Sequence, residues 1–270
     1  MIIESTSTTT TLNAIAALIQ AIAWPIVALL FLLLYRAKIG SLFDVLIKKL
    51  IEAKHVKAGQ LEIDTAEEIQ QVVQRTAEAA GVQDIKNEIP QNQIKAAQLV
   101  GEKLDAAPIA YSQKVDVVYR QVYQLVDEYE TTRQMLPGGP RRTQTMNETA
   151  AKMRALAFAA YPLLPSLMSG KKTGERLAAI CTLQIKPELS HFYWLVDRIV
   201  KEEQPFIFFQ AAVAILELVK SHSLISREVA EPAITAAIEH LRTYRGVPDQ
   251  NTIDVLSEAL QRLEKPSLQQ

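Results

Sequence analysis

The sequence has little of what disulfide-rich and catalytic proteins rely on. Its 270 residues include one cysteine, four histidines and nine glycines, and only 6% of them are aromatic. The single cysteine, Cys181, excludes an intramolecular disulfide. The few glycines favour helices over a turn-rich β fold. The formal net charge of −1 supplies no general attraction to nucleic acid, so we expect no nucleic-acid partner.

The sequence also lacks the residue spacings that mark common active sites. No two of its histidines are close enough for a metal-binding pair on one helix. Residues 169–174 read Ser-Gly-Lys-Lys-Thr-Gly, but Pro165 stands where a phosphate loop needs its first glycine. Cys181 occupies an apolar helical position, where a thiol is expected to fill core space. We therefore predict that the chain is not an enzyme and needs no cofactor or metal.

Hydrophobic residues, by contrast, make up 49% of the chain and gather near its start. Residues 12–35 are apolar except for Asn13, Gln20 and Pro25. As a helix this run would be roughly 36 Å long, enough to cross a hydrocarbon core of about 30 Å. We predict one transmembrane helix here. Gln20 is a candidate contact with a neighbouring span, because amides in lipid seek hydrogen-bond partners; tolerance near the interface is the alternative.

The charges around this run predict its orientation. Residues 1–11 carry only Glu4, whereas the segment after the run is basic despite Asp44 and Glu52. The basic flank consists of Arg36, Lys38, Lys48, Lys49, Lys54 and Lys57. The positive-inside rule then places the N-terminal tail outside and the rest in the cytoplasm. We expect a single-pass protein of the inner (plasma) membrane, with the bilayer as one of its partners.

Residues 36–64 form a predicted juxtamembrane region of two parts. Residues 39–52 show apolar positions at helical spacing, which predicts an amphipathic helix lying on the membrane or in the domain core. Residues 55–64 alternate apolar and polar side chains, with Leu61 and Ile63 on the apolar side. This pattern predicts a short β element. Such an isolated strand is either an extended linker or pairs with another copy of the chain.

The next region, residues 65–136, is predicted to be helical. Thr65 and Glu68 have the spacing of a capping box at a helix start. A longer helix after Pro108 has a heptad seam formed by Tyr111, Val115, Val118, Val122, Leu125 and Tyr129. The seam indicates one side of an intramolecular bundle or, alternatively, self-association. The candidate self-association residues of this helix are Val115, Val118, Val122 and Leu125.

Prolines and glycines interrupt the helical pattern at residues 136–142, and we assign residues 137–144 to a linker. A small group of basic residues accompanies this break. It consists of Arg141, Arg142, Lys152 and Arg154. These residues are interpreted either as solvated surface charges or as a patch for an anionic partner such as a lipid headgroup or nucleotide.

Residues 145–270 read as a helical domain in which short helices are separated by prolines. The run at 206–219 is too short for a second span and is interrupted by Gln210 and Glu217, which predicts a central core helix. Residues 173–265 resemble an α-solenoid of the HEAT or armadillo kind, on the segments GERLAAICTLQ and PFIFFQAAVAILELV. The resemblance implies binding through extended helical surfaces.

A second resemblance lies at the start of the domain. The element K-x-G-x-L-E-I is formed by Lys57, Gly59, Leu61, Glu62 and Ile63. With the preceding apolar run and the following helices, it is similar to uncharacterised bacterial single-pass inner-membrane proteins with a cytosolic all-α domain. We predict a membrane-anchored interaction or scaffold protein that binds proteins and self-associates. The alternative is a membrane effector of a bacterial defence or stress system, whose helical domain senses a partner and whose span perturbs the bilayer.

Overall fold

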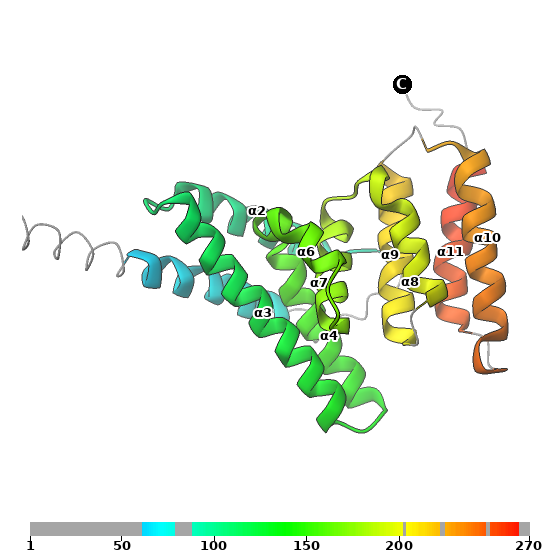
Figure 1. Ribbon diagram of the computed structural model, residues 1–270, viewed down its shortest axis with the longest axis horizontal. Coiled ribbons are helices and arrows are strands. Elements are labelled where there is room, and N and C mark those ends of the chain that lie inside the picture. The colour runs from blue at the N-terminus through cyan, green and yellow to red at the C-terminus, as the bar shows by residue number, and fades with distance from the viewer. Residues whose placement is uncertain (1–60, 79–87, 202–203, 222–224, 247–248, 265–270) are drawn as a thin grey trace, which may run out of the picture. The chain divides into compact units, whose positions relative to one another are not determined.

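The computed structural model describes residues 61–78, 88–201, 204–221, 225–246 and 249–264 (Figure 1). Every regular element in these ranges is a helix, and no strand occurs among them. The predicted all-α fold is therefore confirmed for this part of the chain. The predicted span and amphipathic helix lie outside the described residues.

Residues 61–78 are helical, which corrects the predicted β element for residues 61–64; residues 55–60 of that prediction lie outside the described residues. Leu61 and Ile63 have 38% and 53% of their surface exposed. Thr65, the predicted cap, lies inside the helix, where its hydroxyl donates to the carbonyl of Leu61 at 2.7 Å. The short alternation is misleading because the buried positions further along recur every four residues, as a helix requires. These positions are Ile69, Val73 and Ala77.

Two helices follow and pack with this first one. They are α2 (Gln91–Ala106) and α3 (Tyr111–Met135). The side-chain amide of Gln121 donates to the backbone carbonyl of Ala66 at 2.9 Å, which joins α3 to helix 61–78. On the other side, Lys103 of α2 pairs with Glu68 at 2.7 Å. Helix 61–78 is therefore held against both neighbours.

The heptad seam of α3 faces the interior of the same chain. Val118, Val122, Leu125 and Tyr129 are between 0% and 6% exposed. The helix packs there against α4 (Pro140–Ala155) and α7 (Thr173–Ile185). The interpretation as one side of an intramolecular bundle is confirmed. Self-association through the buried part of the seam is wrong, because these side chains are already covered.

A tight turn connects α3 to α4 where we assign a linker. Gly139 has a φ of 149°, a backbone conformation that favours glycine. Pro140 is the first residue of α4, where its missing N–H is harmless. Residues 140–144 are thus the start of a helix. Buried apolar side chains on both sides of this turn belong to one continuous core cluster.

Three short elements lead from α4 to α7, and the last two each contain a proline. They are α5 (Ala157–Ala160), η1 (Tyr161–Leu163) and α6 (Leu164–Met168). At the start of α7, the backbone N–H of Lys172 donates to the Glu175 carboxylate at 2.8 Å. Lys172 is therefore the N-cap of α7, and Thr173 is the first residue inside the helix.

The remaining helices surround α9 (Pro205–Ser221), which contacts α7, α8 (Phe192–Lys201) and α11 (Gln250–Glu264). Most of its side chains are buried, so the prediction of a central core helix is confirmed. Figure 1 shows α10 (Arg227–Thr243), an addition to the predicted helices, beside α11. A short 3-10 turn, η2 (Leu189–His191), precedes α8, and another, η3 (Tyr244–Gly246), follows α10.

Candidate functional site

The predicted site residues fall into four groups, one of which lies outside the described residues. The basic flank (Arg36, Lys38, Lys48, Lys49, Lys54 and Lys57) and Gln20 lie outside the described residues. Leu61 and Ile63 are exposed helical residues rather than members of a strand. In α3, Val118, Val122 and Leu125 are core residues, and Val115 is half-buried.

The predicted basic patch does not form a shared surface, because its four members have different surroundings. Arg141 is exposed, and Arg142 is half-buried with a guanidinium nitrogen 3.5 Å from the carbonyl oxygen of Leu136. Lys152 pairs with the Glu128 carboxylate at 2.8 Å. Arg154 is fully buried. The prediction of one four-residue patch for an anionic partner is wrong, since Arg154 faces the core of its own domain.

Arg154 instead lies at the centre of a buried polar cluster formed by four helices. Its Nε donates to the Oε1 of Gln93 on α2. Its Nη1 donates to the Oε1 of Gln184 on α7 at 2.8 Å and to the Oε1 of Gln210 on α9 at 3.1 Å. We call Gln93, Arg154, Cys181, Gln184 and Gln210 the Arg154 cluster. All five are buried, so the cluster joins α2, α4, α7 and α9 within the core.

Two of the three glutamines in the cluster, Gln184 and Gln210, also form hydrogen bonds with each other. The Nε2 of Gln184 donates to the Oε1 of Gln210 at 3.0 Å and to its backbone carbonyl at 2.8 Å. These bonds fix both amides with their oxygens toward the guanidinium. A partially satisfied network in a low-dielectric core has large energetic consequences, because each unpaired polar group there is costly.

The electrostatics of the Arg154 cluster are unusual because the cation has no acidic partner among the described residues. Burial lowers the pKa of Arg154, and only the nearby Cys181 thiol opposes that change. Arginine nevertheless stays protonated in proteins. Burial raises the pKa of Cys181 to about 11, against the opposing effect of Arg154. At neutral pH the cluster therefore holds one positive charge beside a neutral thiol.

A second notable region is the surface near residue 61. The carboxylate of Glu62 accepts from Gln113 of α3 at 3.3 Å and is paired with Arg120. These contacts bring residues 61–63 close to the first turns of α3, where Tyr111 is 72% exposed and Tyr119 is 46% exposed. We call Leu61, Ile63, Tyr111 and Tyr119 the entry surface. It combines exposed apolar side chains from two helices.

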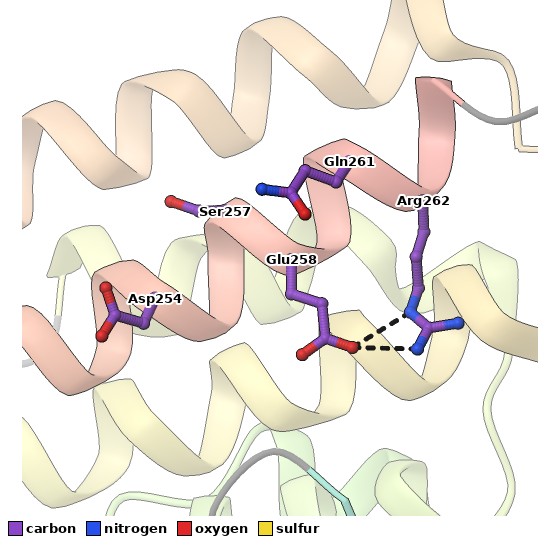
Figure 2. Close-up of a pocket in the computed structure, with 5 residues that line it drawn as sticks. All are labelled: Asp254, Ser257, Glu258, Gln261 and Arg262. Carbon is purple, nitrogen blue, oxygen red and sulfur yellow. Dashed lines mark hydrogen bonds and ion pairs between the residues drawn. The ribbon is translucent and has the colours of Figure 1, made fainter.

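Two further polar groupings of described residues lie outside the Arg154 cluster. Tyr161 donates to Glu188, whose carboxylate lies 3.6 Å from His191 and 3.9 Å from Lys186. Figure 2 shows an open hollow on α11, in which the Arg262 guanidinium donates to Glu258 at 2.9 Å and 3.1 Å. The polar residues that line it come from one helix: Asp254, Ser257, Glu258, Gln261 and Arg262. Such pairs are typical of solvated helix faces.

No group of histidine, cysteine and carboxylate side chains within the described ranges has the arrangement of a metal site. In the same ranges, no helix combines the length and the apolar character that crossing a membrane requires. Neither finding applies to residues 1–60, which lie outside the described ranges.

The Arg154 cluster was not predicted from the sequence, although a weak signal was present. Arg154 stands in the alanine-rich stretch AAKMRALAFAA, and Gln210 interrupts PFIFFQAAVAIL. A polar residue within an otherwise apolar helix is informative because burying it requires partners. The identity of the partners could not be read, since they lie 26 to 61 residues apart in the chain.

Comparisons with known proteins add no further constraint. No protein-family model, no curated protein and no solved structure matches this chain.

Proposed function

We propose that this chain is a membrane-anchored, all-α interaction module that self-associates and presents its helical domain in the cytoplasm. The apolar run at 12–35 and the basic residues that follow it support the anchor and its orientation. A tether of this kind raises the effective concentration of neighbouring copies, so a weak contact between domains is sufficient for assembly.

The observation that carries the proposal is the entry surface. Leu61, Ile63, Tyr111 and Tyr119 expose apolar area at the end of the domain where the chain enters from residue 60. Tyr119 also stacks on Tyr123 with ring centroids 4.3 Å apart. Clustered exposed apolar side chains mark interaction surfaces, and tyrosine is enriched in them. The contact that the sequence offered as strand pairing, with an extended linker as the alternative, is therefore proposed as helix packing.

The C-terminal helices support a binding role of the solenoid kind. α8 packs on α9, α9 on α11, and α11 on α10, which gives a packed helical array whose order differs from the order in the chain (Figure 1). Arrays of this type bind through their outer faces and need no catalytic residues. We accordingly propose a protein partner, and we expect the purified protein to show no hydrolytic or nucleotide turnover.

The proposal is tested by the mass of the full chain in detergent, measured by light scattering with the detergent contribution subtracted. Ile63→Lys and Tyr111→Lys place charges on the entry surface at exposed positions, where substitutions rarely alter stability. We expect the parent to form oligomers and the double variant to shift toward monomer. Val229→Lys is the matched control, because Val229 is 48% exposed on α10.

A parent protein that is monomeric at every concentration would contradict self-association. An oligomer that is equally disturbed by Val229→Lys and by the double variant would show that the entry surface has no special role. Circular dichroism of each variant establishes that its helices are intact, so a change in mass reports on assembly.

A further inference from the structure

The Arg154 cluster contains more hydrogen-bond donors than acceptors. Its acceptors are three amide oxygens, one backbone carbonyl and the Cys181 sulfur, and the three amide oxygens already accept from Arg154. Three buried nitrogens of the cluster have no acceptor among the described residues: Arg154 Nη2, Gln93 Nε2 and Gln210 Nε2. Leaving a buried donor unpaired costs about 1–3 kcal/mol, and more for a charged group. A native core normally avoids this, so these nitrogens indicate a ligand.

The three nitrogens belong to one neighbourhood. Arg154 Nη2 is bonded to the same carbon as the two nitrogens that hold the glutamine oxygens. Gln93 Nε2 and Gln210 Nε2 belong to the same carboxamides as two of those oxygens. Rotating either amide would turn its nitrogen toward the guanidinium and place donor against donor. The orientation is therefore fixed, and the surplus donors remain.

The charge of the cluster selects between the possible acceptors. A water molecule could accept from these nitrogens and donate to the free lone pairs of the Gln93 and Gln184 oxygens, but it is neutral and leaves the buried charge of Arg154 uncompensated. A small inorganic anion only accepts, and it neutralises a buried cation that no carboxylate of the described residues contacts. A lipid headgroup or nucleotide is too large for a fully covered side chain.

We propose that the Arg154 cluster binds one monovalent inorganic anion of halide size, held by the guanidinium of Arg154 and the amide nitrogens of Gln93 and Gln210. The anion completes the junction of α2, α4 and α9. Occupancy therefore stabilises the whole domain, as any ligand of the native state does. This site is independent of the entry surface and of the proposed membrane anchor.

The test uses the full chain in detergent with bromide as the probe. Thermal unfolding is followed from zero to high bromide, with gluconate holding the ionic strength constant. We expect the unfolding temperature to rise with bromide and to saturate. Crystals grown with bromide should show its anomalous signal beside Arg154 Nη2.

Variants locate the effect. Arg154→Met should abolish the bromide response, and Gln93→Leu should weaken the apparent bromide affinity on the order of tenfold by removing one donor. Arg141→Met, at an exposed arginine of the same helix, should leave the response unchanged. If Arg154→Met does not fold, Gln93→Leu and the anomalous signal decide the question.

Any of three results would overturn the proposal. The first is a parent protein whose unfolding temperature does not depend on bromide. The second is a response that Gln93→Leu and Arg141→Met alter equally, and the third is an anomalous signal found only away from Arg154.

Discussion

Two faces of α9 pack against different kinds of side chain, aromatic on one face and polar on the other. Phe208 and Gln210 are two residues apart, and both are fully buried. Phe208 packs edge-on against Tyr244 and His240, with centroid distances of 5.0 Å and 6.3 Å. Gln210 instead accepts from Arg154 and Gln184. One face is stabilised by non-directional apolar burial, whereas the other depends on specific partners that must all be present.

The apolar face should show the largest response to mutation. Phe208→Ala removes most of a buried aromatic side chain and leaves a cavity between α9 and α10. We expect a loss of about 3–5 kcal/mol in the free energy of unfolding, measured by urea titration of the full chain in detergent. A loss below about 1 kcal/mol would show that this face is loosely packed, which contradicts the comparison.

A single substitution on the polar face should cost less stability than Phe208→Ala. Replacing the whole polar network should then restore most of that loss. Gln210→Leu leaves Arg154 and Gln184 each without one acceptor, and we expect a loss of about 2–3 kcal/mol. Replacing the whole network by Arg154→Met, Gln93→Leu, Gln184→Leu and Gln210→Leu should restore most of that loss, because no polar group is then stranded. Urea titrations of both variants check this. A combined variant that is less stable than Gln210→Leu would mean that the network itself stabilises the fold.

The buried Cys181 thiol should make the stability of the polar face depend on pH. Its folded pKa is about 11, above the ordinary value of 9.0. Above pH 9 the unfolded chain releases the thiol proton while the folded chain retains it, so stability falls as pH rises toward 11. The slope is about 1.4 kcal/mol per pH unit. Other groups titrate there too, so the difference in slope between the parent and Cys181→Ala isolates the thiol. Equal slopes would mean that the thiol proton is not retained on folding.

Two helical glycines differ in how much space a side chain would have. A Cβ at Gly174 of α7 would lie 2.9 Å from the Val126 carbonyl oxygen of α3, whereas one at Gly101 of α2 would lie 3.4 Å from Phe158. Gly174→Ala should therefore destabilise by about 1–3 kcal/mol. Gly101→Ala should stabilise by roughly 0.5–1 kcal/mol through helix propensity. Urea titration checks both signs, and a Gly174→Ala variant that is not destabilised would show that α3 and α7 are not in close contact there.

The all-α class and the central position of α9 could be predicted because apolar periodicity reports burial directly. Residues 61–63 could not, since three residues of alternation fit a strand as well as a helix turn. The Arg154 cluster was beyond prediction for a different reason. Sequence indicates that Gln210 needs a partner, but only the packing of four helices shows that the partner is an arginine on α4.

The two long apolar runs of this chain are proposed to have opposite roles: α9 as core, and residues 12–35 as the anchor that places the domain in the cytoplasm. The most direct test is to fuse a reporter after Gln270 in a bacterial host and to separate membranes from the soluble fraction. We expect a fluorescent-protein fusion to glow in the membrane fraction and an alkaline phosphatase fusion to be inactive. An active phosphatase with a dark fluorescent protein, or either fusion in the soluble fraction, would contradict the proposed anchoring.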